Sequence, residues 1–428
     1  MLLQFTVGNF KSFKEKATLS LEATTDDSLE EVNLAQDEGT ELRLVKAAGI
    51  YGANAGGKSN FIEAMSVFRQ LVLTSSKESQ LGQLIPVRPF RLQTDTEKSP
   101  TFFEAVFLKR NVRYRYGFET TRESIISEWF FKQQSSIRET CLFTRENGSI
   151  HPRVPFKEGK GLEERTRSNA LFLSVVAQFN GQIAGELVRV IDQFRTISGM
   201  MHSQHMGYTA SLLDSEEFGR SIRELVRQAD TGIEDLIKED IDRERFLRSL
   251  PKELPEPIRN LIAQNPASPA ILKTIHQRYD SKGQPAGKVE FDLNSEESAG
   301  TRQFVAFAGP FLHTLSEGAV LAVDELDAWL HPLLTRQLVG LFNSSANRRN
   351  AQLIFATHDQ ALLDPRRIRR DQIWFVEKDD LGSSTLFCLD EIKGVRKDAN
   401  FEKEYLLGQF GGVPRVGDFQ RAIPDGKE

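Results

Sequence analysis

The sequence predicts an α/β fold in which a mainly parallel sheet carries a phosphate-binding loop, together with an antiparallel β subdomain and a helical insertion. Three observations support this class. A glycine-rich loop beginning at Gly52 follows an apolar run over residues 44–51. Residues 85–143 alternate with a period of two and are rich in aromatic and β-branched side chains. Beyond Lys288, short continuous apolar strands alternate with helical segments, which is typical of a parallel sheet covered on both faces.

The amino-terminal elements follow from local patterns. Apolar residues alternate with polar or small ones over positions 3–7, and a second apolar segment covers 17–21, which predicts two strands joined by a turn. Acidic and polar residues at 24–39 indicate a loop. The run at 44–51 is expected to be a buried strand, and a helix should follow over 60–73.

The middle of the chain changes period. From about 161 to 250, apolar residues recur at helical spacing, which indicates an inserted helical block. Prolines then interrupt the pattern at Pro251, Pro255, Pro257, Pro266 and Pro269. Because proline cannot continue an α-helix, the flanking helices cannot form one long rod.

Three domains are predicted from these changes. Residues 1–160 form an amino-terminal lobe with the phosphate loop and the antiparallel β subdomain, 161–287 form the helical insertion, and 288–428 form a carboxyl-terminal lobe. Strands are expected in that last lobe at 319–323, 352–356 and 372–377.

Composition limits the functional classes. The chain has 428 residues and a formal net charge of −5, so a contact with nucleic acid would need a local basic patch. Cys141 and Cys388 lie far apart without metal-binding spacing, which argues against a disulfide framework and a zinc site. No apolar stretch approaches the roughly 18 residues of a membrane span, and the amino terminus has no basic region followed by an apolar core. We therefore expect a cytoplasmic protein without a membrane partner.

Residues 52–59 match the phosphate-loop pattern G-x-x-x-x-G-K-[ST] without a mismatch. Glycines allow the tight turn that points backbone N–H groups at the β- and γ-phosphates. Lys58 supplies a positive charge and Ser59 a Mg²⁺ ligand. The predicted nucleotide contacts are Gly52, Asn54, Ala55, Gly56, Gly57, Lys58, Ser59 and Asn60. The segment therefore predicts a site for a nucleoside triphosphate with Mg²⁺.

Two further segments supply polar groups at strand ends. The apolar strand at 319–323 leads into Asp324 and Glu325, a Walker B pattern in which the first carboxylate holds Mg²⁺ through its water shell and the second polarises the attacking water. The alternative is a surface Asp-Glu pair that ends a core strand. His358 follows the strand at 352–356, where a histidine can reach the γ-phosphate, and its alternative is a polar loop residue.

Ser298 and Gly300 precede a helical segment over 304–315, some twenty residues before Walker B. A hydroxyl and unhindered backbone N–H groups at a helix start suit an anion, and the helix dipole adds to the attraction. Taken alone, the pattern is also that of an ordinary helix N-cap.

Together these motifs resemble the ATP-binding-cassette (ABC) ATPase heads of the SMC, RecF and OLD type. In this resemblance, residues 298–300 match the signature motif, 325–327 the D-loop, and 10–13 the strand turn that opens such heads. More narrowly, segments 169–173, 229–233 and 375–379 resemble the AbiL-like ATPases of the AAA family, which accompany toxins or nucleases in bacterial phage-defence loci.

The resemblance implies that ATP joins two heads face to face, with Ser298 and Gly300 of one head completing the nucleotide site of the other. It implies a homodimer or higher homo-oligomer, the cofactors ATP and Mg²⁺, and an effector protein, a toxin or nuclease, encoded nearby. The chain departs from the family pattern at Glu297, where the commonest signature has leucine. The Q-loop glutamine stays open between Gln83 and Gln93.

We therefore predict an ATPase that assembles on ATP, hydrolyses it and regulates a partner effector in anti-phage defence. Two alternatives stay open: a DNA-repair ATPase of the RecF or SMC kind, and a scaffold or sensor gated by nucleotide with little turnover. The basic run at 366–370 offers phosphate contacts for DNA or RNA, and its alternative is a solvated surface.

Overall fold

The computed structural model describes residues 1–35, 42–78, 80, 82–134, 138–200, 202–242, 244, 247–248, 256, 270–414 and 417–419. The chain falls into two compact units, the first formed by Met1–Phe194 with Ile354–Glu428 and the second by Arg195–Leu353. The domain bounds at 160 and 287 stay predictions. The prolines at positions 251 to 269 lie outside the described residues.

The first unit contains a large antiparallel sheet, in which the strands follow one another in the order β10-β9-β8-β7-β6-β1-β2. The strands are β1 (Leu2–Gly8), β2 (Ala17–Ser20), β6 (Thr101–Lys109), β7 (Val112–Thr120), β8 (Ile125–Gln134), β9 (Thr140–Glu146) and β10 (Ser149–Pro152). The antiparallel β subdomain predicted from the period of two is confirmed, and the two amino-terminal strands belong to the same sheet.

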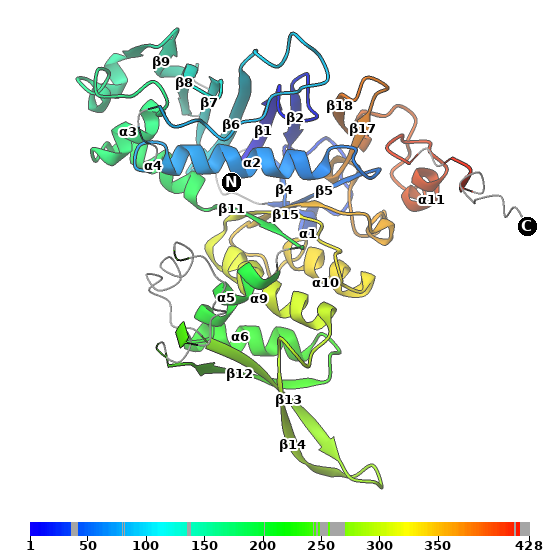
Figure 1. Cartoon of the computed structure of the whole chain (residues 1–428). Coiled ribbons are helices and arrows are strands. Elements are labelled where there is room, and N and C mark those ends of the chain that lie inside the picture. The colour runs from blue at the N-terminus through cyan, green and yellow to red at the C-terminus, as the bar shows by residue number, and fades with distance from the viewer. Residues whose placement is uncertain are drawn as a thin grey trace, which may run out of the picture. The chain divides into compact units, whose positions relative to one another are not determined.

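Helix α2 (Lys58–Thr74), the helix that follows the phosphate loop, packs against this sheet (Figure 1). The ring of Phe5 on β1 meets the rings of Phe61 and Phe68 edge to face, with centroids 5.6 and 5.7 Å apart. Phe68 also stacks on Phe118 of β7 at 5.7 Å. Such aromatic pairs add about 0.5–1.5 kcal/mol each beyond the burial of their area, so they fix the start of α2 relative to the sheet.

The phosphate loop rises from a second sheet, in which β16, β5, β17 and β18 are successive neighbours. Strands β5 and β17 are parallel, and β18 is antiparallel to β17. These strands are β5 (Ala47–Gly52), β16 (Gln352–Ala356), β17 (Ile373–Lys378) and β18 (Ser384–Cys388). The run expected as one strand at 44–51 is divided at Lys46, whose ammonium donates to the Val32 carbonyl at 3.0 Å, so β4 (Leu44–Val45) stands apart and pairs with β3 (Leu34–Ala35).

Shorter elements complete the first unit. They are α1 (Glu30–Asn33), α3 (Phe172–Gln178), α4 (Gln182–Asp192), α11 (Phe401–Leu406) and the 3₁₀ helices η1 (Val154–Gly159), η2 (Gln360–Leu362), η3 (Arg370–Gln372) and η4 (Leu389–Glu391). Tyr405 of α11 stacks on Phe375 of β17 at 5.3 Å, so the carboxyl-terminal helix packs on the phosphate-loop sheet.

A buried carboxylate ties α3 to the antiparallel sheet. Glu128 of β8 has no exposed surface and accepts hydrogen bonds from the N–H groups of Phe172 (2.8 Å) and Leu173 (3.0 Å) and from the Tyr116 hydroxyl (2.9 Å). Burial raises the pKa of Glu128, while the Leu173 N–H and the charge of Arg145 oppose that rise. The segment at 169–173, singled out by its family resemblance, is therefore a structural junction.

The second unit is built around helix α9. Its elements are β11 (Phe194–Ser198), α5 (His202–Leu212), α6 (Glu216–Arg227), β12 (Ile233–Asp240), β13 (Ala270–Tyr279), β14 (Pro285–Asp292), α9 (Ala299–Glu317), β15 (Val320–Asp324) and α10 (Pro332–Phe342). Strands β11 and β15 are neighbours in one sheet, and β12, β13 and β14 follow one another in a separate antiparallel sheet.

Helix α9 continues through Pro310 because a side chain of α5 replaces the missing backbone hydrogen bond. Proline has no N–H, so the carbonyl of Ala306, four residues earlier, loses its helical donor. The Thr209 hydroxyl donates to this carbonyl at 2.9 Å and accepts from the Gly309 N–H at 3.1 Å. A Cβ atom at Gly309 would lie 2.6 Å from the Thr209 hydroxyl oxygen, so glycine permits the close approach.

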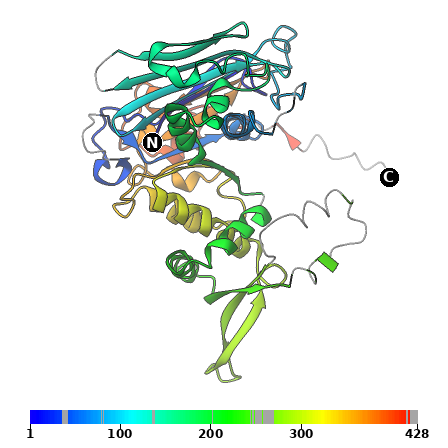
Figure 2. The ribbon, with the colours of Figure 1, turned by 90° about the vertical axis from the view of Figure 1, so that its left-hand side faces the viewer.

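Strands interrupt the block that the sequence pattern predicts to be helical. Helices α3 to α6 lie there, but β11 and β12 lie there too. Strand β12 buries Ile233 and Leu236 and pairs with β13, whose residues come from a part of the chain some 35 positions later. A long-range pairing of this kind overrides local periodicity. Figure 2 shows the hairpin of β13 and β14 extending from the helices of its own unit.

None of the helices in the described part of the chain combines the length and the hydropathy that crossing a lipid bilayer requires.

Replacement of the buried carboxylate tests the junction at α3. In Glu128→Ala, two backbone N–H groups and a hydroxyl lose their acceptor and Arg145 loses a buried counter-charge, so we expect the free energy of unfolding to fall by about 3 kcal/mol. Urea unfolding followed by circular dichroism measures the change. Glu146→Ala, at an exposed carboxylate on β9, is the matched control and should change stability by less than about 0.5 kcal/mol. Equal stability of the two variants would contradict the assignment.

Candidate nucleotide site

The phosphate loop joins β5 to α2, and its glycines are sterically required. Gly52 has φ of 153°, and a Cβ atom there would lie 2.4 Å from the Val376 carbonyl oxygen of β17. Gly57 has φ of 127°, and a Cβ atom there would lie 2.6 Å from the Ser384 hydroxyl oxygen. Real Cβ atoms do not approach other atoms so closely, and L-residues rarely adopt these φ values. The neighbouring strands therefore permit this curl only with glycine at both positions.

Lys58 is the first residue of α2 and is buried, with 6% of its surface exposed. Its ammonium donates to the carbonyls of Gly52 at 2.8 Å and Ala53 at 3.2 Å, so the charge lies within the curl of the loop. Burial of an ammonium is favourable only where such acceptors meet it. This is the place from which a phosphate-loop lysine reaches the β- and γ-phosphates.

Two serines hold the loop from outside. The Ser384 hydroxyl of β18 donates to the Gly56 carbonyl at 2.5 Å, and its N–H donates to the Ser12 carbonyl at 2.7 Å. The Asn60 amide in turn donates to the Ser12 hydroxyl at 2.8 Å. Ser12 lies in the strand turn noted for its resemblance, whereas nothing local to residue 384 indicates its role.

The outer residues of the loop face solvent. Asn54, Ala55 and Ser59 are exposed, and Ala55 adopts a left-handed φ of 60°. These residues thus lie at the surface, where a ligand can reach them. The sequence pattern assigns the loop N–H groups to phosphate and the Ser59 hydroxyl to Mg²⁺.

His358 follows β16 and is exposed. The N–H of Thr357, the residue before it, donates to the Ile50 carbonyl of β5 at 3.2 Å, two residues before the phosphate loop begins. The structure therefore brings His358 to the part of the sheet from which the loop emerges, within the first unit.

In the second unit, β15 ends at Asp324 and a tight turn follows. Glu325 adopts a left-handed φ of 52°, and its carbonyl accepts from the Ala328 N–H at 3.0 Å. The Gly199 N–H donates to the Asp324 carbonyl at 2.8 Å, and a Cβ atom at Gly199 would lie 2.1 Å from the Glu325 carbonyl oxygen. Both predicted carboxylates are half-buried, and Gly199, which sequence reasoning missed, makes their turn possible.

The signature residues contact this same turn. Ser298 is exposed and caps α9, accepting from the Thr301 N–H at 3.1 Å. A Cβ atom at Gly300 would lie 2.6 Å from the carbonyl oxygen of Trp329, which adopts a φ of 65°. The N-terminal turn of α9 therefore packs directly on the loop after Walker B. The structure thus brings Gly300, two residues after Ser298, against the segment after Glu325, and the signature and D-loop assignments stay predictions.

A match to a protein-family model shows the family of the chain. The family model described as "AAA domain, putative AbiEii toxin, Type IV TA system" matches residues 47–364, a span that holds the phosphate loop, the signature, Walker B and His358. The chain belongs to this family. The predicted resemblance to AAA-family ATPases is confirmed at this level, and the AbiEii-type AAA family is one of nucleotide-hydrolysing ATPases.

Other comparisons give more distant similarities. None of the curated proteins matches the sequence. Solved structures similar to the chain include the SMC head domain from Thermotoga maritima, at 13% identity over 90% of this chain and 98% of that chain, with a TM-score of 0.40. An SMC head bound to the C-winged helix domain of ScpA is 13% identical over 90% and 97%, with a TM-score of 0.48. The recombination mediator protein RecF is 12% identical over 90% and 98%, with a TM-score of 0.31.

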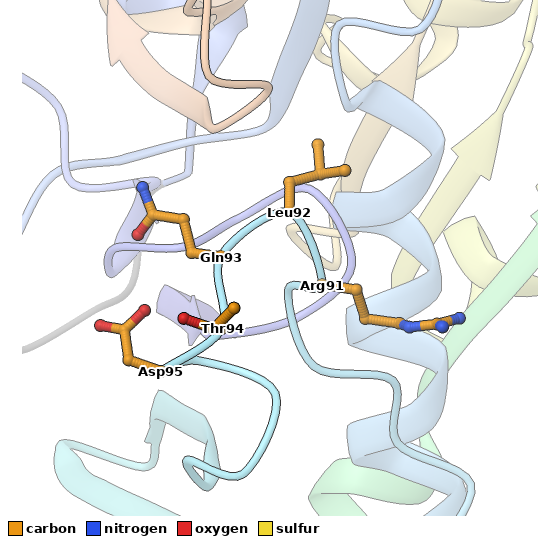
Figure 3. A pocket seen from close by; sticks show the side chains of 5 residues that line it. All are labelled: Arg91, Leu92, Gln93, Thr94 and Asp95. Atoms are coloured by element: carbon orange, nitrogen blue, oxygen red, sulfur yellow. The ribbon is translucent and has the colours of Figure 1, made fainter.

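The loop with the Q-loop candidate Gln93 is fixed by Asn9. The Asn9 side chain donates to the carbonyls of Thr96 and Ser99 and accepts from the Phe90 N–H, with distances of 2.8 to 3.0 Å. Figure 3 shows Gln93 and Asp95 pointing away from Arg91, around an open pocket. The other candidate, Gln83, accepts from the Gln80 N–H through its own side chain. The choice between the two stays open.

The arginine run at 366–370 is largely neutralised by carboxylates. Arg369 is buried and makes two bonds to Asp371, at 2.9 and 2.7 Å. Arg370 pairs with Asp390 at 3.1 Å. Arg366 pairs with Asp364, and its hydrogen bonds hold the pKa of that carboxyl below its ordinary value. Arg369 and Arg370 therefore brace the fold, whereas the exposed side chains of Arg366 and Arg367 share the Asp364 carboxylate at the surface.

A methyl group in the loop tests its role in nucleotide binding. In Gly57→Ala the new Cβ would collide with the hydroxyls of Ser384 and Ser12, and φ would be strained, by about 1–3 kcal/mol. We expect affinity for a fluorescent ATP analogue to fall at least about tenfold, which is about 1.4 kcal/mol. Gly340→Ala, in α10 with no atom near the new Cβ, should bind as the wild type does. Unchanged affinity in Gly57→Ala would contradict the site.

Proposed function

We propose that the chain is an ABC-type ATPase that binds ATP with Mg²⁺, assembles with further copies on its nucleotide, and hydrolyses it to regulate a partner effector. The observation that carries this proposal is the phosphate loop, where Lys58 is held inside a curl that only glycine at two positions permits. Membership of the AbiEii-type AAA family supports the nucleotide chemistry.

In this proposal Lys58 and the loop N–H groups bind the phosphates, and Ser59 with Asp324 holds Mg²⁺. A hydroxyl and a carboxylate are oxygen donors of the kind that this ion takes. The ion would neutralise charge on the transferred phosphoryl group. His358 interacts with the γ-phosphate, which agrees with its exposed position beyond β16, next to the strand that leads into the loop.

Glu325 is the proposed general base. Its turn is fixed on both sides, by the Gly199 N–H at the preceding carbonyl and by the Ala328 N–H at its own. A left-handed φ at a non-glycine residue costs about 1 kcal/mol or more and is found where the surrounding structure imposes it, often at functional sites. Such a turn sets the direction in which the carboxylate leaves the chain, which orientation of an attacking water requires.

Assembly is proposed to occur through the surface that carries Ser298 and Trp329. Both side chains are exposed, Trp329 by 60%, and Gly300 joins them through its contact with the Trp329 carbonyl. A second protomer would cover Trp329 and receive Ser298 and Gly300 at its own bound ATP. The hydroxyl and the helix N-terminus of α9 suit that anion.

The proposed setting is cytoplasmic anti-phage defence, with a toxin or nuclease encoded nearby as the effector. The description of the family, with its toxin and type IV toxin–antitoxin system, supports this setting. A DNA-repair role receives less support, because the arginines at 366–370 are paired with carboxylates. A rise in turnover with duplex DNA would favour that alternative.

Removal of the proposed base tests hydrolysis. In Glu325→Gln we expect phosphate release to fall about a hundredfold or more while ATP binding persists, because general base catalysis is worth about 10²–10⁴. The complex with Mg²⁺ and ATP should therefore stay assembled, as measured by light scattering after size exclusion. Glu216→Gln, at a highly exposed carboxylate on α6, is the control. A wild-type rate in Glu325→Gln, or a monomer at saturating nucleotide, would refute the proposal, and binding without turnover in the wild type would favour a sensor.

The three tryptophans of the chain allow a direct test of the assembly surface. Trp329 is 60% exposed, whereas Trp374 is 5% exposed and Trp129 is half-buried, so burial in an assembly would change mainly the emission of Trp329. On addition of Mg²⁺ and ATP to Glu325→Gln, we expect a blue shift of tryptophan emission. The shift should be lost in a second variant with Trp329→Phe and retained with Trp374→Phe. A shift that survives Trp329→Phe would place the contact elsewhere.

A further inference from the structure

The outer part of the hairpin of β13 and β14 projects from the helices of its unit (Figure 2), and Lys288 at its edge pairs with Glu234 of β12. All residues from 278 to 288 are exposed. A two-stranded hairpin alone is at best marginally stable, so its direction depends on what holds its base. The base contains Thr274, which is fully buried, and His276, which is half-buried.

The base of the hairpin is bonded to the residue that precedes the signature serine. The Glu297 carboxylate accepts from the Thr274 hydroxyl at 2.5 Å and meets the His276 Nε2 at 2.6 Å. Its side chain is only 9% exposed. The His276 ring also packs on Phe291 of β14, with centroids 4.8 Å apart, so both strands of the hairpin contribute.

The short turn that connects β14 to Ser298 is also hydrogen-bonded to the hairpin. The Asp292 N–H donates to the Glu296 carboxylate at 2.6 Å, and the Glu296 N–H donates to the Asp292 carbonyl at 2.9 Å. The next residue, Leu293, donates to the Leu272 carbonyl of β13 at 3.0 Å. The turn from β14 to Ser298 is therefore hydrogen-bonded back to the hairpin at Asp292 and at Leu272.

This arrangement explains what the departure from the common signature contributes. A leucine side chain at position 297 would make only non-directional apolar contacts. A buried carboxylate is tolerated only where it accepts hydrogen bonds, which fix its orientation. The Thr274 hydroxyl and the His276 ring, both from β13, fix the position and the orientation of the Glu297 side chain. The next backbone group along the chain is that of Ser298.

We propose that Glu297 is a positioning residue that fixes the signature serine to the β13–β14 hairpin, so that the hairpin and Ser298 move together. The inference rests on the proposed function, in which Ser298 acts on the nucleotide of a second protomer. The phosphate loop is not involved, so ATP binding to one protomer should not depend on Glu297.

Kinetics of Glu297 variants test the proposal. In Glu297→Ala we expect kcat for ATP hydrolysis to fall about tenfold to a hundredfold, the size of effect that a misplaced group produces, while KM for ATP changes by less than about twofold. Glu297→Gln should recover most of kcat, because its amide oxygen still accepts from the Thr274 hydroxyl. Lys288→Ala, which removes an exposed pair between Lys288 of the hairpin and Glu234 of β12, is the control and should leave kcat unchanged.

A double variant distinguishes loss of the His276–Glu297 contact from a general loss of packing. If His276 acts through Glu297, the double variant with His276→Ala and Glu297→Ala should be no slower than Glu297→Ala alone. Unfolding midpoints within a few degrees of the wild type would show that the fold is retained. A wild-type kcat in Glu297→Ala, an equal loss in Glu297→Gln, or additive losses in the double variant would overturn the proposal.

Hydrogen exchange distinguishes failure of this inference from failure of the proposed function. Without nucleotide, Glu297→Ala should raise the rate of amide hydrogen exchange in the first turn of α9. This turn includes the Thr301 N–H, which donates a hydrogen bond to the Ser298 hydroxyl. If the wild type shows no turnover but exchange still rises at least about tenfold, the proposed function fails and the link stands. If turnover is present and exchange does not change, the link fails.

Discussion

The curl of the phosphate loop depends on the close approach of strands β17 and β18. Val376 and Ser384 occupy the space in which side chains at Gly52 and Gly57 would lie. The same neighbours hold the loop by hydrogen bonds, since Ser384 donates to the Gly56 carbonyl. A loop that is packed from outside keeps its curl without a ligand, so less ordering is required when phosphate binds. The site thus combines residues that lie more than 300 positions apart in the sequence.

The local parts of this arrangement could be predicted from the sequence, and the supporting parts could not. Short motifs predict Gly52 to Ser59, Asp324, Glu325 and His358 as site residues, because the residue types of each motif are dictated by its own backbone and charge. Ser384 and Gly199 carry no local signal. Ser384 matters because it contacts the Gly56 carbonyl, and Gly199 because it lies against the Glu325 carbonyl. Such long-range contacts cannot be predicted from a single sequence.

The fold follows the same division. Period-two alternation predicted the antiparallel sheet, and the apolar run before the loop predicted β5, although the break at Lys46 depends on a tertiary bond to Val32. The block predicted as helical contains β11 and β12, because pairing with β15 and β13 decided the conformation there. Pro310 would argue against a continuous α9, yet the Thr209 hydroxyl from α5 satisfies the carbonyl that proline leaves without a donor.

The role of a charged residue cannot be interpreted until the groups that it contacts are known, as the arginine run and Glu297 show. In the sequence, the run at 366–370 is either a set of phosphate contacts or a solvated surface, and Glu297 is a departure from the commonest signature. In the structure, Arg369 is buried against Asp371, and Glu297 is buried against Thr274 and His276. Both charges are thereby committed to internal bonds. The two residues differ in the segment that they hold. Arg369 braces the segment before β17, whereas Glu297 adjoins the exposed Ser298, which is proposed to act on another protomer. A bond that orients an exposed group can affect function, while one that joins two buried segments contributes to stability alone.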